Sequence, residues 1–308
     1  MSTNLQSKPT PLPIRSAVRS REIVDADVDT LAKFLGAGLG YPSCFYSQVL
    51  DRLKQHPTPT GFPRYGFVLE SDGKIVGAVL MIFSTIWSDD HPSTRCHVTS
   101  WYVEPGYRHF ATLFFSRALK YPDVTYINIS ARPSTRSIIR AQGFLQYSQG
   151  QFVSVPSLNF FSKAKDKRVE IVAGDQDPIA PFEAHELDLL RAHSRYGCIS
   201  LWCRTPERAF PFVFHKRLFK GLLPGVQLVF SRDIQDFVRF VAPLGLYLAT
   251  RGSFVVSIDS NGPIPGLVGK YFDGVEPRYY KGARPRLGDL SYTQAVMSPS
   301  FRRGASGS

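Results

Sequence analysis

The chain has 308 residues, of which 43% are hydrophobic, and a formal net charge of +12 at pH 7. This length predicts one large domain or two ordinary domains, with enough apolar residues for real cores. No apolar run reaches the roughly 18 residues that a membrane-spanning helix needs, so we expect no membrane span.

The N-terminal residues 1–20 lack the apolar core of a signal peptide, so we expect a disordered arm and a cytoplasmic protein. The cysteines have no metal-ligand spacing, which predicts free buried thiols at Cys44, Cys96, Cys198 and Cys203. The positive charge attracts polyanions, but Lys and Arg form no long run. A phosphate-bearing cofactor explains the charge as well as nucleic acid does, and we rank nucleic-acid binding below it.

Residues 22–83 are predicted to form a strand, two helices and a β-hairpin. The strand covers residues 22–24, and Asp27 or Asp29 caps a helix that ends in the Gly-rich segment GAGLGYPS. A second helix is expected over residues 45–55. The hairpin pairs residues 65–69 with 75–83 around Asp72-Gly73, a dipeptide that tight hairpin turns prefer.

A strand, a turn and a helix are predicted in succession between residues 98 and 119. Residues 98–103 are β-branched and aromatic, which suits a buried strand, and Pro105-Gly106 ends it. From Phe110 the apolar residues recur at helical spacing. A helix N-terminus has free N–H groups and a positive dipole end, so the turn at Arg108 is a candidate phosphate site. An ordinary strand–helix turn with a surface arginine is the alternative.

This stretch resembles the cofactor motif of the GNAT acyltransferase superfamily, which reads Val-x-Pro-x-Tyr-Arg before a Gly-rich turn and a helix. Val103, Pro105, Tyr107 and Arg108 match the motif, while Ala111 and Leu113 stand at its glycine positions. The resemblance implies that this turn binds the pyrophosphate of acetyl-CoA or another acyl-CoA. The residues assigned to the cofactor are Trp101, Tyr102, Val103, Arg108, His109, Phe110, Ala111, Thr112, Arg132 and Arg136.

The rest of the first half is predicted to contain a strand at 124–129, a helix at 135–142 closed by Gly143, and one or two strands at 144–155. The Gly143-Phe144 ending also resembles the GNAT superfamily. In that superfamily a Tyr four residues before the Gly often protonates the leaving thiolate. Ile139 holds that position here, so the resemblance implies that this chain does not use that acid.

The second half is predicted to repeat the first, beyond a charged linker at residues 162–168. The sequence EIVAGDQD at Glu170 echoes EIVDADVD at Glu22. The same order of elements follows, which indicates an internal duplication: a helix at 181–193, strands at 198–204, 210–216 and 226–230, a helical region at 233–250 and a strand at 254–259. The turn that corresponds to the cofactor turn contains Asp233, which we interpret as a helix cap, so we expect no coenzyme there. Residues 262–297 are predicted to form a surface loop and a last strand.

Acyl transfer from a thioester to an amine needs a base and a donor for the carbonyl oxygen. The GNAT resemblance implies a backbone N–H donor near Trp101–Val103. The base candidates are His97, whose ordinary pKa suits the task, and Glu104 at the strand end, with Ser100 as a proton relay. Each has a structural alternative: a packed strand histidine, a solvated turn acid and a packed serine.

We therefore expect an α/β fold with two GNAT-like halves, each a mixed, mostly antiparallel twisted sheet flanked by helices. The predicted domains are an acyl-CoA-binding domain at 21–162 and a degenerate second domain at 163–297, between disordered ends at 1–20 and 298–308. The predicted function is transfer of an acyl group, such as acetyl, from acyl-CoA to an amine of an unidentified acceptor. The alternative is a non-catalytic binding protein with the same fold, which the missing Tyr and glycines favour.

Overall fold

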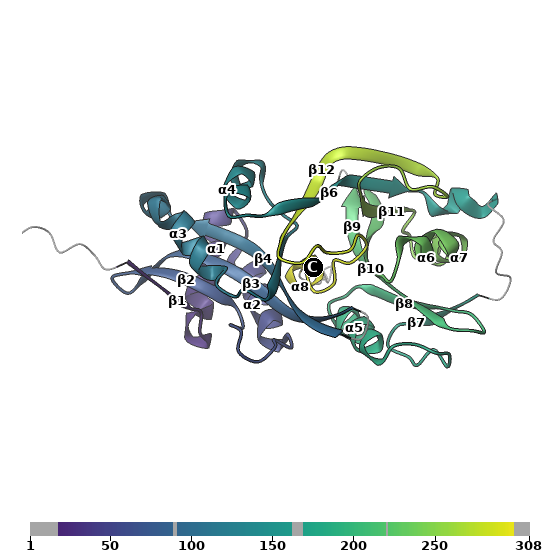
Figure 1. The fold of residues 1–308 in the computed structure, drawn as a ribbon, viewed down its shortest axis with the longest axis horizontal. Helices are drawn as coiled ribbons and strands as arrows, with labels where there is room; N and C mark the ends of the chain where they lie inside the picture. The colour runs from purple at the N-terminus through teal and green to yellow at the C-terminus, as the bar shows by residue number, and fades with distance from the viewer. Residues whose placement is uncertain (1–17, 89–90, 162–168, 220, 299–308) are drawn as a thin grey trace, which may run out of the picture.

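A computed structural model describes residues 18–88, 91–161, 169–219 and 221–298. The described strands form one mixed twelve-stranded sheet that runs through the whole molecule (Figure 1). Six strands belong to the first half of the chain: β1 (Val18–Glu22), β2 (Gly66–Ser71), β3 (Lys74–Ser88), β4 (His91–Val103), β5 (Val124–Asn128) and β6 (Leu145–Ser154). Six belong to the second half: β7 (Glu170–Ala173), β8 (Ile199–Arg204), β9 (Ala209–Phe219), β10 (Leu223–Ser231), β11 (Val255–Ser260) and β12 (Gly269–Lys281).

Helices cover both faces of the sheet, and the alternation of side chains along β3 shows why. Val79, Met81 and Phe83 join one apolar cluster, which includes Phe114 of α3. Leu80 and Ile82 join the cluster on the other face, under α1 and α2. The first-half helices are α1 (Val28–Leu39), α2 (Ser43–Gln55), α3 (Ala111–Ala118) and α4 (Arg136–Ala141), with short 3-10 turns at Asp25–Asp27, Pro105–Phe110, Pro133–Thr135 and Pro156–Phe161.

The second half is layered in the same way. Phe212 and Phe214 of β9 pack against helices α6 (Ile234–Arg239) and α7 (Val241–Ala249). Val213, between them, faces the opposite cluster, which holds Leu190 of α5 (Ala184–Arg195). A short last helix, α8 (Gln294–Met297), lies between the two halves in Figure 1 and packs on α2.

The strand order of the sheet is symmetric about its centre. It reads β1-β2-β3-β4-β5-β12-β6-β11-β10-β9-β8-β7, and exchanging β1–β6 with β7–β12 gives the same order read from the other end. Each half thus has five strands of its own, and the two final strands cross over: β12 pairs with β5, and β6 pairs with β11. This is the topology that an internal duplication with exchanged last strands would have. It also means that the predicted boundary at residue 162 does not separate two independent sheets.

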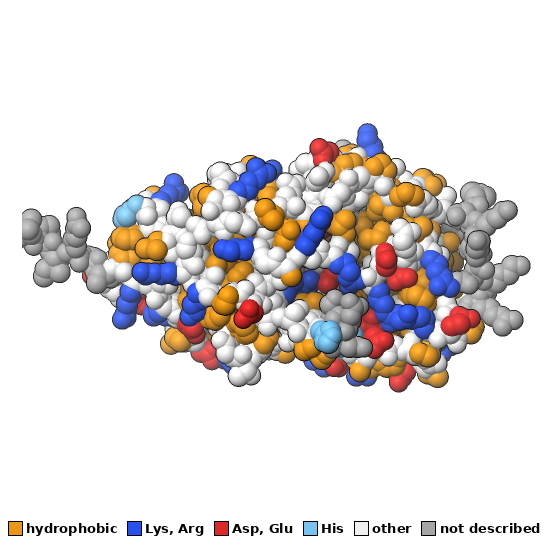
Figure 2. Space-filling model, viewed as in Figure 1, with side chains coloured by type: hydrophobic (Ala, Val, Ile, Leu, Met, Phe, Trp, Pro, Cys, Tyr) orange, Lys and Arg blue, Asp and Glu red, His pale blue; other side chains and the backbone are white. Residues whose placement is uncertain are grey.

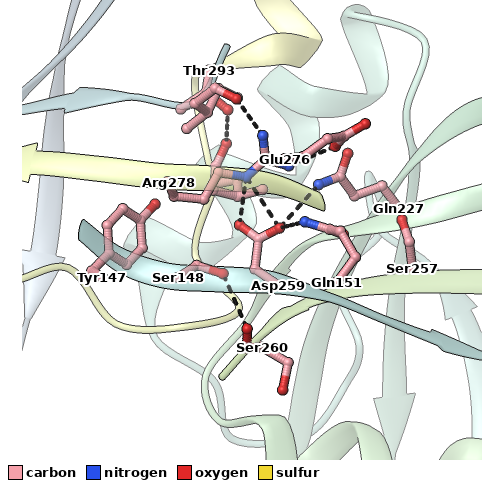
Figure 3. Close-up of polar contacts among 12 residues, drawn as sticks. Tyr147, Ser148, Gln151, Gln227, Ser257, Asp259, Ser260, Glu276, Arg278 and Thr293 are labelled. Carbon is pink, nitrogen blue, oxygen red and sulfur yellow. Dashed lines mark hydrogen bonds and ion pairs between the residues drawn. The ribbon is translucent and has the colours of Figure 1, made fainter. Parts of the chain in front are cut away.

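A buried polar network fills the centre of the sheet, where the exchanged strands meet (Figure 3). Arg278 of β12 is 2% exposed and pairs with the equally buried Asp259 of β11 at 3.0 Å. The Asp259 carboxylate also accepts hydrogen bonds from the side-chain amides of Gln151 and Gln227. Because a buried charge is stable only when it is paired and hydrogen-bonded, these contacts tie four strands of both halves together.

Several sequence predictions need correction. The first strand ends at Glu22 and begins at Val18, within the predicted disordered arm, so residues 23 and 24 are not strand. Strand β4 begins at His91, seven residues before the predicted start, because its first part pairs with the long β3. Cys44 is exposed, whereas Cys96, Cys198 and Cys203 are buried free thiols as expected. The charged linker and most of both predicted disordered ends lie outside the described residues.

Other predictions are confirmed. The hairpin turn at Asp72-Gly73 joins β2 to β3, and both residues have positive φ, as a tight hairpin turn requires. Asp233 caps α6, since its carboxylate accepts the Gln235 N–H at 2.9 Å.

A separate question is whether any helix could span a membrane. Within the described ranges, no helix is long and apolar enough to do so.

Candidate active site

The candidate site lies where the parallel strands β4 and β5 separate. They pair from Thr94–Val124 to His97–Ile127, and no pairing between them continues beyond that point in the described structure. Just past it, β4 carries a bulge opposite β3, between Thr99 and Tyr102. Ser100 sits in this bulge with a φ of 48°. A left-handed non-glycine residue in a strand is costly, and such strain often marks a functional position.

The cofactor turn is helical from its beginning. Residues Pro105–Phe110 form a 3-10 helix that continues directly into α3. The Tyr107 N–H donates to the Glu104 carbonyl at 2.9 Å, and the Ala111 N–H donates to the Arg108 carbonyl. The helical backbone therefore starts five residues before the predicted position at Phe110, and part of its N–H groups are already bonded. Arg108, His109 and Thr112 are exposed, while Phe110 and Ala111 are half-buried.

The end of β4 packs against helices on both faces. The Trp101 ring stacks on Phe115 of α3, with centroids 4.4 Å apart, and its buried indole N–H has no hydrogen-bond partner. The Tyr102 ring lies against α1, where a Cβ on Gly38 would come within 2.2 Å of it. Gly38 is therefore required for this close approach. Val103 is buried in the core under α3.

His97 is placed in the interior. It is 2% exposed, and neither of its ring nitrogens has a hydrogen-bond partner. Burial, together with the charges of Arg278 and Arg95, lowers the pKa of His97 to about 3. A group with so low a pKa is a weak base at neutral pH, so this geometry argues against His97 as the general base. Glu104 remains half-buried at the end of β4, and its N–H donates to the Val76 carbonyl at 2.9 Å.

Tyr46 of α2 is a site residue that the sequence did not reveal. Its hydroxyl donates to Ser100 Oγ at 3.2 Å and so reaches the bulge of β4 from the neighbouring layer. Burial raises the pKa of Tyr46, while Ser100 and the charge of Arg132 act in the opposite direction. The hydroxyl is therefore protonated at neutral pH and can act as a donor or acid. A buried Tyr in an apolar helix stripe is typical of core packing, so no sequence signal identified it.

The remaining predicted residues lie after β5. Arg132 is exposed, and its charge acts on the Tyr46 hydroxyl. Arg136 is half-buried, and its Nε donates to the Ala131 carbonyl at 3.5 Å. Ile139, at the position of the superfamily's Tyr, is fully buried in the core and carries no polar group. The structure thus joins Ser100 to Tyr46 by a hydrogen bond and buries His97 in the interior.

The second half has the same strand separation, but its gap is filled by the chain itself. Strands β10 and β11 pair from Gly225–Val255 to Gln227–Ser257, and β10 then bulges after Leu228. Beyond this point the segment 288–290 pairs with the free edge of β10. The Leu290 N–H donates to the Val229 carbonyl at 2.7 Å, and the Ser231 N–H donates to the Gly288 carbonyl at 3.0 Å. No corresponding segment pairs with β4 in the described structure.

The filling segment is anchored to the first half. Arg95 of β4 pairs with Asp289 at 3.1 Å and donates to the carbonyl and hydroxyl oxygens of Ser291. Burial alone would raise the pKa of Asp289, but Arg95 and Arg286 hold it at about 2.

Among the described residues no cluster of His, Cys, Asp and Glu is arranged to hold a metal ion.

Comparison with solved structures finds proteins whose fold is similar to that of this chain. A GCN5-related N-acetyltransferase from Anabaena variabilis is 12% identical and has a TM-score of 0.55, over 86% of this chain and 72% of that one. A putative acetyltransferase from Pyrococcus horikoshii is 12% identical with a TM-score of 0.54, over 94% of this chain and 99% of that one. The chain has the GNAT fold. A probable N-acyltransferase from Enterococcus faecalis is 11% identical with a TM-score of 0.55, over 89% and 74% of the two chains.

No family profile and no curated protein sequence match this chain. The GNAT fold is therefore recognised through its geometry, and at 11–12% identity the likeness concerns the fold. The expectation of a mixed α/β sheet with flanking helices is confirmed.

Proposed function

We propose that this protein transfers an acyl group from an acyl-CoA to an amine, and that the first half carries the reaction. The observation that carries the proposal is the separation of β4 and β5 after His97–Ile127, directly beside the bulge at Ser100. The edge of β4 beyond this point has no strand partner in the described structure, whereas the matching edge of β10 is paired with residues 288–290. An extended ligand such as the pantetheine arm of coenzyme A can bind to an open strand edge through main-chain hydrogen bonds.

The residues around this edge fit the coenzyme. Arg108 and His109 are exposed at the turn that follows β4, and Arg132 is exposed after β5. These side chains supply positive charge for phosphate groups. The buried Trp101 indole N–H has no partner, which is consistent with a polar ligand atom at this place. The bound coenzyme would supply an acyl thioester, whose carbonyl is already activated for attack.

The chain's own groups then handle protons. The amine must be neutral when it attacks, and Glu104, half-buried at the end of β4, is the base candidate that the geometry leaves. The Tyr46 hydroxyl, held by Ser100, donates a proton to the sulfur as the carbon–sulfur bond breaks. Ser100 gives its proton to the Tyr46 oxygen and regains one through water from Glu104, which took it from the amine. The proton lost by the amine thus replaces the one given to the thiol, and all three groups return to their starting state. Tyr46 thus acts as the acid for the leaving thiolate, a role that Ile139, at the position of the superfamily's Tyr, cannot fill.

A non-catalytic binding protein is the second candidate. It is favoured by the helical turn at Pro105–Phe110, in which part of the N–H groups are bonded to the chain itself. Release of free thiol from acetyl-CoA in the presence of a panel of amines distinguishes the two. Thiol release that depends on an added amine supports the acyltransferase, and binding of acetyl-CoA without release supports the alternative.

Replacing Arg108 by Ala should weaken coenzyme A binding by about 1–3 kcal/mol, because a charge-assisted hydrogen bond to phosphate is lost. Isothermal titration calorimetry measures the effect. Arg117→Ala is the matched control, since Arg117 is exposed in the last turn of α3. Equal affinities for Arg108→Ala and the unmodified protein would contradict the placement of the pyrophosphate at this turn.

A further inference from the structure

A cavity lies in the second half of the chain's fold, at the end of β10. It has a volume of about 390 Å³ and is lined by the β10–α6 turn, by Tyr147 of β6 and by the segment 284–287. The segment that fills the β10 gap, residues 288–290, follows directly in the sequence. The cavity is therefore separate from the candidate active site at β4.

The wall of the cavity is rich in arginine. It contains Arg232, Arg284 and Arg286 and one carboxylate, Asp233, which already accepts the Gln235 N–H. Arg232 is paired with Glu186 of α5. Arg286 donates to the Ser231 carbonyl at 2.9 Å and pairs with Asp289 at 3.8 Å. Arg284 is exposed and has no ion-pair partner among the residues that the structure describes. Asp289 is shared with Arg95, so four guanidinium groups meet three carboxylates here, those of Glu186, Asp233 and Asp289.

Tyr147 provides an independent sign of a missing partner. It is 2% exposed, and its buried hydroxyl makes no hydrogen bond within the described structure. Figure 3 shows Tyr147 next to the polar network around Arg278. Burial raises the pKa of Tyr147, so the hydroxyl stays protonated and can only gain by donating to an acceptor. The hydroxyl of Ser231, adjacent to Arg232, is also buried without a partner.

We propose that this cavity binds the phosphate group of a small molecule. Guanidinium groups bind phosphate oxygens with paired N–H donors, and a phosphate has enough oxygens to accept from two arginines and a hydroxyl at once. The phosphate is not that of a coenzyme A bound in the β10 gap, because residues 288–290 occupy that gap. The ligand is inorganic phosphate or a small phosphomonoester. This site does not depend on the function proposed for the first half.

Calorimetric titration of the full-length protein with inorganic phosphate and with AMP, at about 0.15 M salt, tests the site. We expect saturable binding to one site, weakened about tenfold or more by Arg284→Gln and by Tyr147→Phe; a tenfold change corresponds to about 1.4 kcal/mol. Tyr147→Phe removes a hydroxyl that has no partner, so the free protein should unfold at an unchanged or higher temperature. Tighter binding of AMP than of phosphate identifies a phosphomonoester, and equal binding identifies free phosphate.

Two control variants separate this site from general charge attraction. Arg251→Gln removes an exposed arginine that packs on the Tyr247 ring, and Arg117→Ala removes an exposed arginine in the last turn of α3. Both should bind phosphate with unchanged affinity. The proposal is overturned if neither ligand binds saturably at concentrations up to about 10 mM. It is equally overturned if Arg284→Gln and Tyr147→Phe bind as tightly as the unmodified protein.

Discussion

Lowering the pH from 7 to 5 should destabilise this protein by several kcal/mol, because three buried histidines are held in their neutral form. Burial is the main cause in each case: it lowers the pKa of His97 to about 3 and those of His56 and His193 to about 4. In the unfolded chain these groups titrate near 6.5. As the pH falls below 6.5 the unfolded state therefore takes up protons that the folded state does not, and the equilibrium shifts toward unfolding.

The hydrogen bonds of two of these rings leave no place for a second proton. His193 Nδ1 lies 2.8 Å from the Leu189 carbonyl, and its Nε2 accepts the Tyr292 N–H at 3.0 Å. His56 Nε2 lies 2.9 Å from the Phe83 carbonyl, so its Nδ1 is the acceptor for the Tyr196 hydroxyl at 2.9 Å. Tyr196 and Tyr292 come from the second half of the chain. Protonation of His56 would therefore break a contact that joins the halves, and protonation of His193 would break one within the second half.

The size of the effect follows from linkage. At pH 5 each group is about 1.5 units below its unfolded pKa, which costs about 2 kcal/mol per histidine, or about 6 kcal/mol if all three rings stay buried. Asp289, with a pKa of about 2, stays ionised over this range and loses its stabilising charge only at lower pH. The histidines thus dominate between pH 6.5 and 5.

Equilibrium urea unfolding between pH 7.5 and 5 measures this loss. Burial also lowers the pKa of His215, on β9, to about 4. The unfolding midpoint should therefore fall steadily below pH 6.5, with an uptake of three to four protons per molecule. His56→Gln should reduce this uptake by about one proton, while His109→Gln, which changes an exposed residue, should leave it unchanged. A free energy of unfolding that stays constant between pH 7.5 and 5 would contradict the prediction. It would mean that the folded and unfolded states bind the same number of protons.

The order of elements could be predicted from the sequence because its signals are local. The Asp72-Gly73 turn, the apolar stripe of α2 and the Asp233 cap each depend on neighbouring residues, and each is found where expected. The exchange of β6 and β12 could not be predicted in this way. Both strands pair with residues more than 100 positions away, and nothing in a short apolar strand specifies such a partner.

The candidate site was predictable only in part, for the same reason. The strand, the turn and Arg108 are contiguous in the sequence and formed a recognisable motif. Tyr46 reaches Ser100 from a helix 54 positions away, and its hydroxyl is placed by the packing of α2 on the sheet. His97 has the right residue type on the right strand, but its ring lies in the interior, where burial and the charges of Arg278 and Arg95 lower its pKa. Residue type alone could not distinguish a catalytic histidine from a buried one.

Replacing Tyr46 by Phe should reduce amine-dependent thiol release by about 10²-fold or more, the usual cost of losing a positioned acid. The ring would keep its packing against Tyr41 and Phe45, and only the hydroxyl bonded to Ser100 would be lost. The free energy of unfolding should change by only about 0.5–1.5 kcal/mol, the net value of one hydrogen bond. Because burial raises the pKa of Tyr46, the unmodified protein should keep this acid in its protonated form at neutral pH.

The matched control is Tyr41→Phe, which removes a hydroxyl from a neighbouring, exposed tyrosine and should leave turnover unchanged. Ser100→Ala should produce a smaller loss than Tyr46→Phe, because water can replace a relay more easily than an acid. Calorimetry should give the same affinity for coenzyme A in all three variants, so that the loss appears in kcat alone. Full turnover in Tyr46→Phe would assign the proton of the leaving thiol to water, and the pair Tyr46–Ser100 would then serve only to hold α2 on the bulge of β4.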